Sequence, residues 1–290
     1  MPPTTLISAA EARTAPPDAT VLQIAPPECL TLLPAPCHAL LLAEGQPGRE
    51  WRTLASLFGE LLIPGYSLPV PCDPDWYCRS YAPPPELAGP RPPFRFYTAA
   101  DSSPRKNLVG LLAAFFLAFR PGDGVELVVR TNDPAVKPLV ERTADEGGYR
   151  ATPPVRVVSR PLKPAEGAGL ATACDCYVTA SRAEIWDLDA LDAVLFGRTP
   201  IAPDQSSYRA FLGGEDPAGF LVRTAPEPCG PRRLWEPPVL TELAAAMTAA
   251  VADADARVCR ADAGRALADL YSYEVVGRDL RGLLCRTTKT

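Results

Sequence analysis

From residue 94 onward, short apolar runs alternate with segments of helical period. The strand-length runs span 94–100, 124–131, 155–159, 174–180 and 199–203. The helical segments between them span 107–120, 134–148 and about 187–196. Strands that alternate with helices of this length favour a parallel sheet with helices on both faces. The sequence therefore predicts an α/β fold with a doubly wound sheet.

The region before residue 94 is less regular but of the same kind. The runs 20–26 and 38–45 each predict a buried strand that ends in a turn. The segment 51–64 places apolar residues on one helical face and ends in a strand-like run. This pattern predicts a smaller α/β region that precedes the main sheet.

A proline-rich segment separates these two regions. Residues 80–93 contain repeated prolines and predict an extended, semi-rigid linker. We therefore expect an N-terminal domain over 1–85 and a larger domain over 86–270. The last segment, 271–290, is predicted to be helical.

Composition excludes several classes of protein. The net charge of −5 over 290 residues argues against sequence-blind binding to nucleic acid, although a local basic groove stays compatible with it. The nine cysteines form no C-x-x-C pair and indicate reduced thiols in the cytoplasm. His38 is the single histidine, so we expect no histidine-based metal centre or triad. No apolar stretch reaches the roughly 20 residues of a membrane span.

The segment 181–202 carries the strongest sign of chemistry. Four carboxylates lie within nine residues of it: Glu184, Asp187, Asp189 and Asp192. They sit where a predicted strand passes into a helix, and doubly wound sheets bind ligands beyond the carboxyl ends of their strands. A solvated acidic turn is the alternative interpretation. A ligand with several hydroxyl groups is the interpretation that the position favours.

Two cations stand at a second junction of this kind. Arg105 and Lys106 come directly before the helical segment 107–120. Positive charges at a helix N-terminus oppose the helix dipole, so an isolated helix gains nothing from them. Together with the acids, they favour a ligand that carries both hydroxyl groups and negative charge.

Three blocks of the sequence resemble a known family. Residues 96–131, 173–202 and 270–284 resemble, in this order, the C-terminal half of retaining GT-B glycosyltransferases. The donor site of that family has the signature S-x-x-E-G-[FW]-G-L-P-x-L-E-A-M-x-x-G-x-P-V-I-A. The resemblance implies two Rossmann-like domains, here with a reduced N-terminal domain, and a last helix over 271–290 that crosses back to the first domain.

The resemblance implies roles for the residues of the donor site. Glu184 would lie beside the donor sugar as a catalytic residue, and Asp192 would bind the ribose. Arg105 and Lys106 would bind the diphosphate. The other implied donor-site residues are Trp186, Asp187 and Leu188 near the sugar or β-phosphate, Arg182 as an added charge, and Arg160 near the nucleobase. On the acceptor side, His38 would be a further catalytic or positioning residue, and Glu44 would face the cleft.

The sequence also departs from the family pattern. Ile185 and Asp187 stand where the family has glycines, and Asp189 stands where it has proline. Asp192 replaces the second glutamate and is one methylene shorter. Because of these changes, a non-catalytic protein that only binds nucleotide sugars is the alternative interpretation. The four retained residues Arg105, Lys106, Glu184 and Asp192 favour an enzyme.

The resemblance implies a glycosyltransferase that moves a sugar, with retention, from a nucleotide-diphosphate donor to an acceptor hydroxyl. The donor is a substrate, and no cofactor or metal is expected. A hydroxymethylated base in double-stranded DNA is one expected acceptor, as in compact phage enzymes that would act in the host cytoplasm. Five arginines give residues 45–95 a basic character: Arg49, Arg52, Arg79, Arg91 and Arg95. A carbohydrate or small-molecule acceptor is the alternative.

Overall fold

The computed structural model describes residues 21–25, 37–41, 60–62 and 69–287, apart from 150, 185 and 231–233. Before residue 69 and after residue 282, only the backbone is described. Contacts divide the chain into two compact units, residues 1–71 with 271–290 and residues 72–270. The second unit therefore begins earlier than the boundary that the proline-rich segment predicts.

The first unit contains a parallel sheet in the order β1-β2-β3. Its strands are β1 (Val21–Ala25), β2 (Cys37–Leu41) and β3 (Glu60–Leu62). Each strand lies at a run for which the sequence predicts a strand. Helix α12 (Tyr273–Thr287) belongs to the same unit and lies in a stretch that is predicted to be helical.

The second unit is built on a parallel sheet in the order β6-β5-β4-β7-β8-β9. The strands are β4 (Phe94–Ala99), β5 (Val125–Arg130), β6 (Val155–Val158), β7 (Cys176–Val178), β8 (Thr199–Pro203) and β9 (Phe220–Val222). The sequence predicts all of them except β9. The α/β fold class is confirmed.

The strand order places a topological switch point between β4 and β7. The chain runs outward from β4 through β5 to β6 and then returns to form β7 on the other side of β4. Tyr97 of β4 and Tyr177 of β7 are register partners across this junction. In sheets of this type, ligands bind outside the carboxyl ends of the strands at the switch point.

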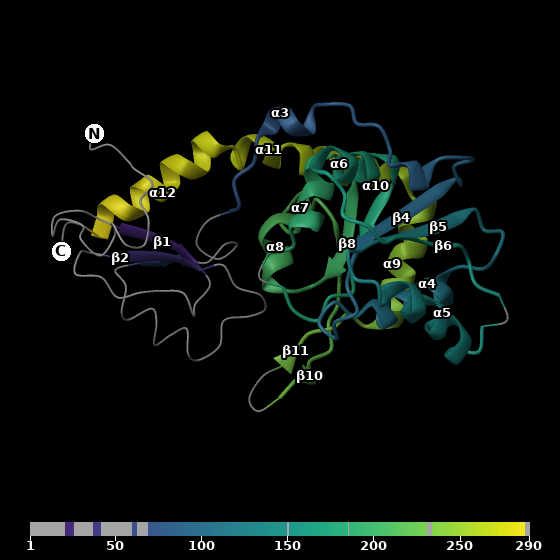
Figure 1. Cartoon of the computed structure of the whole chain (residues 1–290). Coiled ribbons are helices and arrows are strands. Elements are labelled where there is room, and N and C mark those ends of the chain that lie inside the picture. Colours follow the sequence, from purple (N-terminus) through teal and green to yellow (C-terminus); the bar gives the residue numbers. More distant parts are fainter. Residues whose placement is uncertain are drawn as a thin grey trace. The chain divides into compact units, whose positions relative to one another are not determined.

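Helices cover both faces of this sheet (Figure 1). One face carries α4 (Leu108–Ala118), α5 (Val136–Glu146) and α9 (Leu240–Ala252), which enclose the main apolar core. The other face carries α6 (Pro164–Ala173), α7 (Leu188–Leu195) and α10 (Ala254–Arg265). Strand residues therefore alternate between the two layers: Phe96 packs in the first, whereas Tyr97 faces the second.

The proline-rich segment 80–93, predicted to be an extended, semi-rigid linker, lies within the second unit. Leu87 lies in a short 3-10 helix (Pro85–Leu87) and is buried. The carbonyl oxygen of Ala82 lies so close to α6 that a Cβ atom at Gly169 would come within 1.9 Å of it. The segment packs against α6 because Gly169 leaves room for its backbone.

Helix α6 is not predicted from the sequence. Its sequence PAEGAGLATA contains two glycines and mostly alanine among its apolar residues. An alanine-rich helix has little contrast between its faces, so the apolar periodicity that reveals α4 is absent here. Glycine also lowers helix propensity, and only tertiary packing offsets this cost.

We predict opposite effects for two alanine substitutions in α6. Gly169→Ala should lower the free energy of unfolding by about 1–3 kcal/mol, because the new Cβ atom overlaps the Ala82 carbonyl. Gly167→Ala is the matched control: its Cβ atom would meet only Arg130 Nη1, at 3.7 Å. The control should be neutral or stabilising, since alanine favours the helix. Urea denaturation measures both, and equal stabilities would contradict the packing described here.

Candidate functional site

Two loops meet at the carboxyl ends of β4 and β7. Asn107 adopts the left-handed backbone conformation (φ 51°) at the start of α4, and its Nδ2 donates to the Ala180 carbonyl at 3.0 Å. Asparagine tolerates this conformation better than most residues. The Arg182 backbone N–H also donates to the Arg105 carbonyl, at 2.8 Å. These contacts hold the segment 105–107 against the loop after β7.

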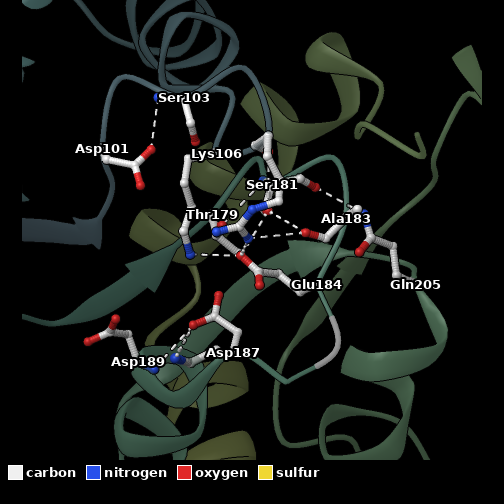
Figure 2. Close-up of polar contacts among 12 residues, drawn as sticks. Asp101, Ser103, Lys106, Thr179, Ser181, Ala183, Glu184, Asp187, Asp189 and Gln205 are labelled. Atoms are coloured by element: carbon white, nitrogen blue, oxygen red, sulfur yellow. Dashed lines mark hydrogen bonds and ion pairs between the residues drawn. The ribbon is translucent and has the colours of Figure 1, made fainter. Parts of the chain in front are cut away.

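This junction brings Arg105, Lys106 and Glu184 together. Glu184 Oε1 accepts hydrogen bonds from Arg105 Nη1 and from Lys106 Nζ, both at 2.7 Å. It also accepts one from Ser181 Oγ at 3.0 Å. Figure 2 shows Lys106 and Glu184 pointing toward each other. Glu184 is buried, so its charge depends on these partners.

The electrostatics of this cluster are those of a compensated buried site. Burial raises the pKa of Glu184, Asp187 adds to this effect, and the neighbouring cations lower it. Burial alone would lower the pKa of Lys106, but Asp187 and Glu184 outweigh it, so the pKa of Lys106 is raised. Lys106 therefore stays charged at neutral pH and can attract an anion.

Asp187 caps helix α7. Its Oδ1 accepts from the backbone N–H groups of Asp189 and Ala190, both at 3.1 Å, which is the usual role of an N-cap aspartate. Its Oδ2 accepts from Tyr208 Oη at 2.8 Å and from Tyr177 Oη at 3.1 Å. Figure 2 shows Asp187 between the Glu184 cluster and Asp189. Both of its oxygens are thus bonded within the protein.

A cavity of about 260 Å³ opens beside the cluster, between α6 and α7. Its lining residues come from the ends of β4 and β5, the loop before α6, and helices α3 (Pro74–Tyr77), α6 and α7: Trp76, Tyr97, Ala99, Arg130, Leu162, Lys163, Pro164, Gly167, Ala168, Leu170, Ala171, Asp189, Asp192 and Phe196. The cavity is therefore charged on one wall and apolar on another.

Two carboxylates of α7 line the charged part. Asp192 Oδ1 accepts from Tyr77 Oη at 2.6 Å, and burial raises the pKa of Asp192. Asp189 Oδ1 lies 3.2 Å from Arg130 Nη1. Burial raises the pKa of Asp189 to about 6, although Arg130 lowers it. Asp192, for which the family resemblance implies binding of a ribose, lines the wall of this cavity.

Two arginines that were predicted to contact the ligand instead form ion pairs with carboxylates of the protein other than Glu184. Arg160 lies between two carboxylates, with Nε 2.6 Å from Glu86 and Nη2 2.7 Å from Glu166. Arg182 forms an ion pair with Glu227 of the β10–β11 hairpin (β10, Glu227–Pro228; β11, Leu234–Trp235) at 2.6 Å. Its guanidinium also bonds the Pro104 carbonyl. Arg160 thus links the segments that contain Glu86 and Glu166, and Arg182 links the hairpin to the loop before α4.

The remaining predicted residues lie in several places. Trp186 packs against Phe211, with ring centroids 5.1 Å apart, and Leu188 is exposed at the first turn of α7. His38 lies in β2, of which only the backbone is described. Glu44 and Ile185 are outside the described residues.

Several cavity residues were not singled out as site residues from the sequence. These are Tyr97, Arg130 and, as a cavity carboxylate, Asp189. Tyr77, which donates to the cavity residue Asp192, was not singled out either. Arg130 is the last residue of a predicted strand, so its place at a carboxyl end was a usable signal. Tyr97 lies inside a strand, where a tyrosine is ordinarily a packing residue, and no pattern marks it.

Within the described ranges, no group of three or more His, Cys, Asp or Glu side chains is placed to hold a metal ion. The helices in the same ranges include none that is long and apolar enough to cross a membrane. The site itself offers two cations, a buried glutamate and a carboxylate-lined cavity. Such a set can bind an anionic centre flanked by hydroxyl groups.

No protein-family model matches the sequence, and no curated protein matches it significantly. Solved structures do match. TarM of S. aureus, in a complex with UDP, gives a TM-score of 0.62 at 11% identity, over 86% of this chain and 51% of TarM. HepE of Anabaena, with UDP and glucose, gives 0.62 at 15%, over 87% and 64%. The UDP-forming trehalose-phosphate synthase of Burkholderia xenovorans gives 0.63 at 13%, over 88% and 69%.

The chain thus spans 51% and 64% of the first two of these proteins. At such low identity the likeness concerns the fold. The structural neighbours are GT-B glycosyltransferases, and the parallel sheet with its switch point between β4 and β7 agrees with them. The chain has the GT-B fold.

Proposed function

We propose that this protein is a nucleotide-sugar glycosyltransferase. The observation that carries the proposal is the cluster in which Arg105 and Lys106 both bond Glu184, beside a cavity lined by Asp192. A nucleotide sugar has a ribose diol, a diphosphate and a sugar ring. The cavity carboxylate, the two cations and the buried glutamate supply one partner for each of these groups.

The nucleoside is proposed to occupy the cavity. Asp192 would accept two hydrogen bonds from the ribose hydroxyls, and each charge-assisted bond contributes about 1.5–3 kcal/mol. Lys106 and Arg105 would then meet the diphosphate, while Glu184 would lie beside the sugar. Trp186, Leu188 and the backbone at Asp187 are proposed to border the sugar, and Arg160 and Arg182 to support the surrounding loops.

The diphosphate would compete with Glu184 for the same cations. In the described state, Glu184 Oε1 takes a hydrogen bond from each of them at 2.7 Å. Bound phosphates would draw both cations away and leave the glutamate free to accept from sugar hydroxyls. Donor binding and the release of Glu184 are therefore one event in this proposal.

Retention of configuration is the finer part of the proposal, and it rests on the resemblance to retaining enzymes. His38 and Glu44 are proposed to position the acceptor. The described cysteines are free thiols, which supports a reducing compartment such as the cytoplasm: Cys72, Cys78, Cys174, Cys176, Cys229 and Cys259. The resemblance to compact phage enzymes matters to this proposal only if the acceptor is DNA, which is considered next.

The pairing of the arginines bears on whether the acceptor is DNA or a smaller molecule. DNA would need cations that are free to contact phosphates. Arg95 is buried against Glu126 at 2.8 Å, and Arg91 lies 2.6 Å from Asp175. Two of the five arginines that suggested DNA are thus paired with carboxylates. A carbohydrate or small-molecule acceptor needs no such contacts and is the class that we favour over hydroxymethylated DNA.

Asp192→Asn should weaken UDP binding about tenfold to hundredfold, because it removes charge from the bonds to the ribose. UDP is the first ligand to test because TarM and HepE were solved with it. Isothermal calorimetry measures the affinity for UDP and for 2′,3′-dideoxy-UDP. The second ligand is the control because it lacks the two ribose hydroxyls. The wild type should prefer UDP, whereas the variant should bind both about equally. A variant that keeps the full preference would contradict the role of Asp192.

Glu184→Gln should bind UDP more tightly than the wild type, since the cations lose a competing carboxylate, yet transfer should fall by at least about 30-fold. Calorimetry and a UDP-release assay measure the two effects. Glu126→Gln is the matched control, because Glu126 is also buried and bonded by two arginines, Arg95 and Arg156. It should lower the melting temperature and leave UDP affinity unchanged. UDP binding without turnover in the wild type would instead indicate the non-catalytic alternative.

The acceptor class is tested with plain and hydroxymethylated duplex DNA. Each duplex is incubated with the protein and a panel of UDP-, GDP- and ADP-sugars, then digested to nucleosides and weighed by mass spectrometry. We expect no mass-shifted nucleoside, and we expect turnover with carbohydrate acceptors. A sugar-sized mass increase on the hydroxymethylated nucleoside, weakening steeply as salt rises, would establish the DNA acceptor instead.

A further inference from the structure

Two tyrosines stand side by side at the switch point but differ in their hydrogen bonding. Tyr97 of β4 and Tyr177 of β7 are register partners, and their rings meet edge to face with centroids 5.1 Å apart. The Tyr177 hydroxyl donates to Asp187 at 3.1 Å. The Tyr97 hydroxyl is buried and has no hydrogen-bond partner among the described residues.

A buried hydroxyl without a partner is costly. Leaving such a group unbonded costs folding free energy, and most buried polar atoms in proteins are therefore bonded. Phenylalanine at position 97 would keep the ring contact with Tyr177 and avoid this cost. The hydroxyl of Tyr97 thus has no structural use in the part of the chain that the structure describes.

The position of Tyr97 suggests another use. Tyr97 lines the same cavity as Asp189, Asp192 and Arg130, and it lies deeper along β4 than Ala99, which also lines it. The cavity lining also includes the apolar and aromatic side chains of Trp76, Phe196 and Leu170. A flat heterocyclic ring fits such a wall, and its edge atoms need a polar partner there.

We propose that the Tyr97 hydroxyl binds the ligand of this cavity, by donating a hydrogen bond to a carbonyl oxygen or ring nitrogen at the edge of the nucleobase. The inference rests on the proposed function, and it adds a specificity-determining residue to it. Burial, with smaller effects of Cys174 and the cavity carboxylates, raises the pKa of Tyr97 well above its ordinary value. The hydroxyl therefore keeps its proton and acts as a donor. Asp189 and Asp192 accept hydrogen bonds, so the cavity would offer the ligand both a hydrogen-bond donor and hydrogen-bond acceptors.

The test is Tyr97→Phe, titrated by calorimetry with UDP, GDP, ADP and inorganic pyrophosphate, using the full chain. Affinity for the diphosphate that the wild type binds best should fall about 5- to 10-fold, the effect of one hydrogen bond. Affinity for pyrophosphate, which has no base, should not change. The melting temperature should stay the same or rise, because a costly buried hydroxyl is removed.

Tyr177→Phe is the matched control. It removes a hydroxyl that is bonded to Asp187, so it should lower the melting temperature and leave the discrimination between UDP, GDP and ADP unchanged. Equal nucleotide affinities in the wild type and Tyr97→Phe would overturn the inference and assign the hydroxyl to a buried water. A loss of stability in Tyr97→Phe as large as in the control would overturn it too. If the wild type binds none of the three nucleotides, the proposed function itself fails.

Discussion

The site depends on one buried carboxylate that two cations share. Glu184 has little contact with solvent, and a buried charge is tolerated only where partners compensate it. Its partners Arg105 and Lys106 come from the loop before α4, whereas Glu184 follows β7. Strands β4 and β7 are parallel neighbours because the order in which strands are added to the sheet reverses at the switch point. The strand order therefore makes the charge cluster possible, and the cluster in turn ties the two loops together.

Much of this arrangement could be predicted from the sequence, because its signals are local. Apolar runs of strand length gave the central strands, and helical spacing of large side chains gave α4. The acids of 181–202 and the cations before α4 stand at junctions, which parallel sheets bring to one edge. The family resemblance assigned them to one site, and the strand order brings the two loops together.

What the sequence could not supply depends on distant contacts. Helix α6 has no periodic signal, and the segment 80–93 packs on it only because Gly169 admits a carbonyl. Arg160 looked available for a nucleobase, but Glu86 and Glu166 hold it from both sides. From the sequence, Tyr97 resembles a core tyrosine; only the structure shows that its hydroxyl is unbonded and that the residue lines the cavity. In each case a partner far along the chain decides the role of the residue.

One departure from the family pattern, Asp187, changes what the start of α7 can offer a ligand. Asp187 stands in place of a glycine and bonds the N–H groups of Asp189 and Ala190, so these donors at the start of α7 are already used. In the described state, a phosphate at this junction would meet a capped helix and a carboxylate instead of free N–H groups. Its charge would then have to be balanced from the other loop, where Arg105 and Lys106 stand next to each other. A second cation beside Lys106 is what a capped α7 requires if the ligand is a diphosphate.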